Sequence, residues 1–159
     1  MTRLLLLAAL AAASPESDCF LGSLPPVAVK DSAERRRAVD ACTELIVADP
    51  TDPRPYFHRG EARYVGPPPL LGWNEAPLFD IRVADDPDPV IADYQEALAR
   101  AGGKRKLRQD GVAWLRVGYL HAQKGAWQDA VRAWRKAEGF EETARPARPR
   151  LFFGQGRLV

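Results

Sequence analysis

Three segments of the chain repeat one spacing of small and apolar residues, and this repetition restricts the fold more than any other feature. The segments run from Ala38 to Pro50, from Val90 to Gly102 and from Ala130 to Glu142. In each, small or apolar residues stand four, seven and eight positions after the first, although Glu138 breaks the pattern in the third. Such spacing forms one stripe along a helix. The sequence therefore predicts amphipathic helices that pack through one face.

Two further segments share a different pattern, an aromatic residue followed four positions later by glycine. They run from Tyr56 to Gly66 and from Trp114 to Lys124, with Gly60 and Gly118 at the shared position. Glycine inside a helix costs about 1 kcal/mol relative to alanine. Its use here indicates that a neighbouring helix approaches too closely for a side chain.

Capping signals mark where the predicted helices begin. Asp52 and Asp88 each precede a proline and suit the N-cap position. A metal site at Asp86 and Asp88 is the alternative, but no histidine or further acidic cluster lies nearby in the sequence. The patterns predict an all-α fold of about five helices, at about Ser32–Ala48, Pro53–Val65, Pro89–Ala101, Leu107–Lys124 and Ala126–Glu138.

The last two predicted helices carry a motif of recognisable spacing. The matching positions are Trp114, Val117, Gly118, His121, Gly125, Trp127, Ala130, Trp134 and Ala137. This motif resembles the tetratricopeptide repeat (TPR) of exported bacterial proteins, a helix–turn–helix unit of about 34 residues. His121 departs from the preferred tyrosine, and Glu142 departs from the preferred proline.

An earlier repeat has the same positions but is interrupted by a proline-rich insert at 66–88. The segment Ala38–Pro50 precedes it and matches only the second helix of the repeat unit. A smaller insertion lies around Lys104 to Asp110. The resemblance implies an α-solenoid of helical hairpins over residues 32–138. A generic helical bundle is the alternative.

The resemblance also implies a binding surface. In such repeats the first helix of each pair lines an exposed concave face that holds a peptide or a partner helix. We therefore expect no catalytic residues, and a partner-binding face of exposed side chains with aromatic anchors. Its members would be Phe57, Glu61, Tyr64, Leu115, Arg116, Tyr119 and Gln123.

The first residues resemble an export signal. Arg3 precedes an apolar run at Leu4–Ala13, which ends in small residues, and Ser14 would begin the mature chain. Ten apolar residues are too few to span a bilayer, which takes about 20. A buried N-terminal helix is the alternative. We expect a signal peptide at 1–13, an extension at 14–31 and a tail at 139–159, with no transmembrane segment in a periplasmic or secreted mature chain.

Cys19 and Cys42 are the chain's two cysteines. In an exported protein such a pair is a disulfide candidate, and closing this loop should stabilise the fold by about 3 kcal/mol. The alternative is two unrelated thiols, with Cys42 serving only as a small buried residue.

Several segments allow a functional or a structural interpretation. The insert is either a binding loop or a lid over exposed core. The basic cluster Lys104–Lys106 either contacts an acidic partner or membrane surface, or is a solvated loop near the negative end of a helix. In the tail, Leu151–Phe153 are expected to pack on the last helix.

Composition excludes some classes of function. The net charge of +2 and the interleaving of basic with acidic residues argue against nucleic-acid binding. Nucleophile elbow, glycine-rich phosphate loop and metal-ligand spacing are absent from the sequence, and the two histidines suit repeat positions. We expect no cofactor or metal and no enzyme activity. The predicted function is an exported scaffold for protein–protein interaction; the alternatives are an envelope assembly factor and a small cell-wall hydrolase.

Overall fold

The computed structural model describes residues 14–21, 32–65, 83–102 and 109–140, together with residues 143, 147, 155 and 156. Several predictions lie outside these residues. They concern the signal peptide at 1–13, the basic cluster at 104–106, the insert up to residue 82 and most of the tail.

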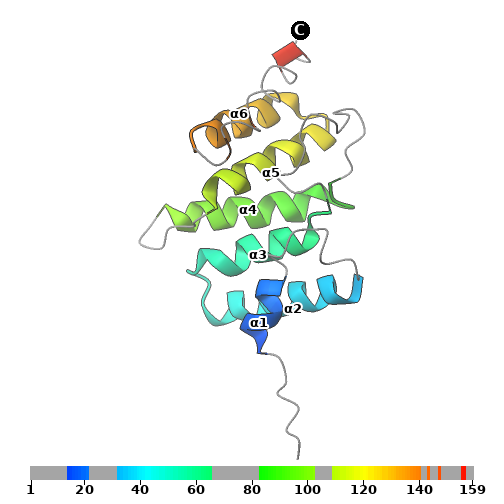
Figure 1. The fold of residues 1–159 in the computed structure, drawn as a ribbon, viewed down its shortest axis with the longest axis vertical. Helices are drawn as coiled ribbons and strands as arrows, with labels where there is room; N and C mark the ends of the chain where they lie inside the picture. The colour runs from blue at the N-terminus through cyan, green and yellow to red at the C-terminus, as the bar shows by residue number, and fades with distance from the viewer. Residues whose placement is uncertain are drawn as a thin grey trace, which may run out of the picture.

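Within the described residues the chain forms six helices and no strand. They are α1 (Pro15–Leu21), α2 (Ser32–Ala48), α3 (Pro53–Arg63), α4 (Pro87–Ala101), α5 (Asp110–Gln123) and α6 (Trp127–Glu138). From α2 to α6 each helix packs on the next in chain order, so that they form one row (Figure 1). The short helix α1 packs on α2 and also touches α3. The all-α prediction is confirmed.

The start of α4 differs from the prediction. Asp86, not Asp88, is the N-cap, and its carboxylate accepts a hydrogen bond of 3.1 Å from the backbone N–H of Asp88. Both Pro87 and Pro89 fit the first turn because N–H groups there need no intrahelical acceptor. At α3 the prediction is confirmed, since Asp52 accepts from the N–H of Arg54 at 3.0 Å.

The two glycines of the shared aromatic–glycine pattern, Gly60 and Gly118, receive aromatic rings from the following helix. A Cβ on Gly60 would lie 3.1 Å from the Tyr94 ring of α4. A Cβ on Gly118 would overlap the indole of Trp134 on α6. The expected close approach is thus present in both helix pairs, with glycine on the first helix and the aromatic residue on the second.

A disulfide joins Cys19 of α1 to Cys42 of α2, and their Cα atoms are 4.7 Å apart. Both residues are 0% exposed. The predicted pairing is confirmed. Sequence periodicity missed α1, because its 7 residues are too few to show a helical pattern. The bond and the contacts with α2 and α3 hold this helix on the end of the row.

Replacing both cysteines tests the contribution of this bond. We expect Cys19→Ala/Cys42→Ala to lower the free energy of unfolding by about 3 kcal/mol, because the unfolded chain loses a closed loop. Urea denaturation followed by circular dichroism measures the change. The wild type under strong reductant should match the variant, and an unchanged midpoint in both would contradict the prediction.

Candidate functional site

The structure buries most of the side chains that the repeat resemblance placed on an exposed face. The buried residues are Phe57, Tyr64, Leu115, Arg116 and Tyr119, each 4% exposed or less. Their predicted exposure is wrong. They belong to the core or to buried polar contacts, and no groove of open aromatic side chains lies at these positions.

A buried ion pair accounts for Glu61 and Arg116. The Arg116 guanidinium donates two hydrogen bonds of 2.8 Å to the two carboxylate oxygens of Glu61. Tyr94 donates to the same carboxylate at 2.6 Å, and the guanidinium lies 3.9 Å above the centre of the Tyr64 ring. These contacts tie α3 to both α4 and α5.

The environment of this cluster raises the pKa of Tyr94 and of Arg116. Burial and the negative charge of Glu61 raise the pKa of Tyr94 well above its ordinary value, so its hydroxyl stays a donor. Burial alone would lower the pKa of Arg116, but Glu61, Tyr64 and Tyr94 together outweigh this effect and the net pKa is raised. The cluster therefore joins helices through a Tyr94 hydroxyl that stays protonated and an Arg116 guanidinium that stays charged.

Gln123 is also engaged within the chain. Its side-chain oxygen accepts from the N–H groups of Val83 at 2.8 Å and Ala84 at 3.2 Å, and its amide donates to the carbonyl of Ala84 at 2.8 Å. The N–H of Val65 donates to the carbonyl of Val83 at 2.8 Å. Gln123 thus anchors the segment that enters α4 beyond the interruption.

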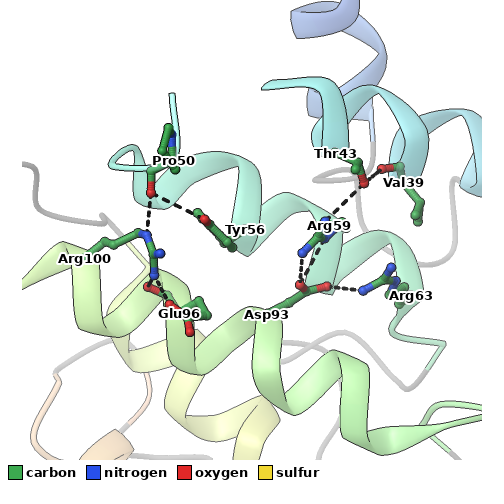
Figure 2. Close-up of polar contacts among 9 residues, drawn as sticks. All are labelled: Val39, Thr43, Pro50, Tyr56, Arg59, Arg63, Asp93, Glu96 and Arg100. Carbon is green, nitrogen blue, oxygen red and sulfur yellow. Dashed lines mark hydrogen bonds and ion pairs between the residues drawn. The ribbon is translucent and has the colours of Figure 1, made fainter. Parts of the chain in front are cut away.

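A second ionic network links α2, α3 and α4 (Figure 2). Asp93 is 3% exposed. Its two carboxylate oxygens form ion pairs with the guanidinium groups of Arg59 at 2.7 Å and Arg63 at 2.6 Å. Arg59 also donates at 3.1 Å to the hydroxyl of Thr43, which donates to the carbonyl of Val39 at 2.7 Å. These bonds fix the spacing of three consecutive helices.

The opposite end of α3 is fixed by a backbone carbonyl, also drawn in Figure 2. The carbonyl of Pro50 accepts from Arg100 Nε at 2.6 Å and from the Tyr56 hydroxyl at 3.4 Å. The Arg100 guanidinium lies 4.3 Å from the centre of the Tyr56 ring. Both ends of the α3–α4 pair are thus held by polar contacts, which makes this part of the row a rigid support.

An open groove lies on that support, between the N-terminal half of α2, the end of α3 and the start of α4. Its volume is about 640 Å³, within the range of about 300–1,000 Å³ typical of ligand sites. Five apolar residues line it: Val39, Ala62, Val65, Pro89 and Val90. Val65 is 40% exposed, so part of this lining is open to water.

Charged residues surround the apolar lining, and several of them are already engaged. Arg63 is bound to Asp93, and the Asp86 carboxylate caps α4. Asp85 is also engaged within the chain. The lining residues Arg35, Arg36 and Asp40 have no ion-pair partner in the part of the chain that the structure describes.

This groove was not predicted from the sequence. Its one local signal is the run Arg35–Arg37 on a predicted amphipathic helix, which the repeat pattern does not explain. Apart from other residues of α2, the lining comes from segments more than twenty residues away along the chain. Their convergence depends on how α2 and α4 pack around the end of α3.

His58 is a half-buried titratable group outside the groove. Its ring lies edge-on to those of Phe20 and Phe57, with centroids 4.8 and 5.7 Å away. Burial lowers the pKa of His58 from 6.5 to about 4; Glu61 opposes this shift and Arg54 adds to it.

This histidine should make stability depend on pH. Between pH 6.5 and about 4 the unfolded state takes up a proton at His58 while the folded state does not, so stability falls as the pH falls. Above pH 6.5 the residue is neutral in both states. We expect a loss on the order of 2 kcal/mol, allowing for partial exposure.

Urea denaturation at about pH 7 and about pH 4.5 measures the effect. His58→Phe should lose less stability than the wild type between these two conditions. His121→Gln, at a half-buried position on α5, serves as the control and should behave more like the wild type. An equal loss in the wild type and His58→Phe would exclude this histidine as the cause.

Two classes of site are absent from the described residues. No group of three or more histidine, cysteine, aspartate or glutamate side chains there is placed to hold a metal ion. No helix in the same residues is long and apolar enough to cross a membrane. Comparison with known proteins adds no assignment: no protein-family model matches the chain, and no curated protein sequence matches it.

Proposed function

We propose that this chain is an exported, TPR-like helical scaffold that binds another protein through the groove between α2, α3 and α4. The observation that carries the proposal is the groove itself. It combines an apolar lining, partly open to water at Val65, with charged side chains at its rim. Interfaces commonly place an apolar centre inside a polar rim.

The rigidity of the surrounding helices supports a binding role. Asp93 holds α4 to α3 through two arginines, and Arg59 extends the network to Thr43 of α2. A surface that keeps its shape loses little conformational freedom when a ligand binds, which favours affinity. The groove walls are part of this network, since Arg63 and Val39 belong to both.

The helix contacts support a repeat architecture. The pairs Gly60–Tyr94 and Gly118–Trp134 place the same residue types at the same kind of helix contact. Consecutive helices also pack mainly on their neighbours in sequence, which is typical of solenoid proteins. The confirmed Cys19–Cys42 disulfide supports export, because disulfides persist in oxidising compartments.

Site-specific photo-cross-linking tests the proposal. A benzoylphenylalanine placed at Val65, in the groove, should cross-link to a protein partner in cells. The same residue at Gln128, exposed on α6, is the matched control and should not. The identified partner, once purified, should bind the wild-type chain in calorimetry and bind Val65→Asp at least tenfold more weakly (about 1.4 kcal/mol).

The outcomes are distinct. Equal cross-linking from Val65 and Gln128, or partner binding that Val65→Asp leaves unchanged, would exclude the groove. Absence of any cross-linked protein from Val65 would contradict the scaffold function. Circular dichroism of Val65→Asp checks that the helices remain intact.

A further inference from the structure

We infer that α1 is a redox-controlled conformational switch: it lies on α2 and α3 while Cys19 and Cys42 are bonded, and it leaves them when a dithiol reduces the bond. Its departure uncovers the His58 ring at the end of the row of helices. The inference is independent of the groove between α2, α3 and α4. It rests on how little besides the disulfide holds α1 in place.

The helix α1 is too short to be stable on its own. It contains 7 residues, whereas isolated helices shorter than about 12–15 residues are marginal in water. Among the α1 side chains whose burial the structure describes, Cys19 alone is fully buried. Phe20 is half-buried, and Pro15, Glu16 and Ser17 are exposed. The bonded cysteine is therefore the residue that anchors this helix.

The core that α1 shares with α2 is small and separate from the larger core of the other helices. Its buried members are Cys19, Ala41 and Cys42, and Leu45 packs against them. Two of these three buried residues are the bonded cysteines. The hydrophobic stabilisation of α1 is therefore small, because it grows with the apolar area removed from water.

The disulfide opposes the release of α1 for the same reason that it opposes unfolding. It joins positions that are 23 residues apart in the sequence. A chain with α1 released is a partly unfolded state, and the closed loop lowers the entropy of that state as it does that of the fully unfolded chain. Breaking the bond removes this restriction, and terminal segments with few buried contacts are the first to open.

Reduction of the bond takes two thiol–disulfide exchanges. Both cysteines are 0% exposed, so a dithiol reaches the bond only while α1 is briefly displaced. One thiolate of the dithiol attacks a cysteine sulfur, the S–S bond breaks, and the other cysteine leaves as a thiolate and takes up a proton. The second thiolate of the dithiol then displaces the attached cysteine, which also takes up a proton. The chain gains two electrons and two protons, and the dithiol becomes a cyclic disulfide.

The imidazole of His58 reports the position of α1, because the Phe20 ring of α1 lies against it with 4.8 Å between the ring centroids. With α1 in place, burial lowers the pKa of His58 from 6.5 to about 4. The charged groups that act on this histidine are Glu61, Arg54 and Asp52. They belong to α3 and its N-cap, so they remain when α1 leaves. Loss of the cover therefore raises the pKa of His58 towards its ordinary value.

Amide hydrogen exchange of the full chain, oxidised and in excess dithiothreitol, tests the release of α1. We expect exchange in residues 14–21 to be at least about tenfold faster in the reduced chain, with unchanged exchange in α5 and α6. Cys19→Ser/Cys42→Ser should exchange as the reduced wild type does, with or without dithiothreitol. Phe20→Ala with the disulfide intact is the matched control, and it should keep residues 14–21 protected.

Titration of the two histidines by nuclear magnetic resonance gives a second readout. The pKa of His58 should rise from about 4 in the oxidised chain towards 6.5 in the reduced chain. His121 of α5 is the control, and its pKa should be the same in both forms. Reoxidation with glutathione disulfide should restore the low pKa of His58 and the slow exchange of residues 14–21.

Three results would overturn the inference. Residues 14–21 that stay protected after reduction, or a His58 pKa that stays near 4, would show that α1 remains in place without the bond. Faster exchange in α5 and α6 together with α1 would show that reduction unfolds the whole chain and does not release one helix. Each of these results leaves the cross-linking test at Val65 unaffected, so the switch and the scaffold function can fail separately.

Discussion

Trp134→Ala is expected to lower the free energy of unfolding by about 3–5 kcal/mol, the usual cost of truncating a fully buried aromatic side chain. Trp134 is 1% exposed, lies over Gly118 and meets the Tyr119 ring edge-on at 5.8 Å between centroids. Its removal leaves a cavity that α5 and α6 cannot close, because Gly118 has no side chain to fill it. A loss of this size approaches the whole stability of an ordinary domain.

The midpoint of urea denaturation measures this loss, and Trp114→Ala is the matched control. Trp114 lies on the same helix pair but is only half-buried, and its ring faces Lys136 at 3.9 Å. Its truncation should cost less than half as much. Equal losses for the two variants would contradict the packing of α5 on α6 through Trp134.

Glu61→Gln is the second substitution with a large expected effect, again about 3–5 kcal/mol. It removes the carboxylate that Arg116 meets with two hydrogen bonds of 2.8 Å. The arginine side chain is 3% exposed and keeps its charge, so the variant contains a buried cation without its counter-charge. Such a change costs far more than the pair itself contributes.

Two further variants separate this explanation from a general sensitivity of the fold. Glu96→Gln breaks the ion pair between Glu96 and Arg100, in which the Glu96 side chain is 52% exposed. This substitution should change the free energy of unfolding by less than about 1 kcal/mol. Glu61→Leu/Arg116→Met removes both charges and should recover most of the loss. A double variant no more stable than Glu61→Gln would show that the buried charge is not the cause.

The sequence predicted most of the fold because helix signals are local. The apolar stripe of Ala38 and Cys42, and the Asp52 cap before Pro53, locate α2 and α3 without knowledge of their neighbours. The predicted start of α4 was two residues too late because Asp86 and Asp88 both precede a proline. In the structure Asp86 is the N-cap, in a segment whose preceding residues Val83 and Ala84 hydrogen-bond to Gln123 of α5.

The binding surface could not be predicted in the same way. A helical pattern shows that Tyr64 and Tyr119 share a face with their neighbours in the repeat, but it does not show what covers that face. Here Arg116 packs on Tyr64 and pairs with Glu61 on another helix, which buries Tyr64 and Arg116 and leaves the Glu61 side chain only 8% exposed. Predicting the groove requires the relative positions of α2 and α4. The hydrogen bonds and ion pairs around Asp93 set these positions.

Hydrogen–deuterium exchange of the chain, alone and bound to the partner identified from Val65, tests the central claim most directly. Binding should slow exchange in residues 32–40, 62–65 and 85–90, which contain the groove lining, with little change in α6. Protection confined to α5 and α6, with unchanged exchange in the first turns of α2 and α4, would contradict the claim that this groove holds the partner.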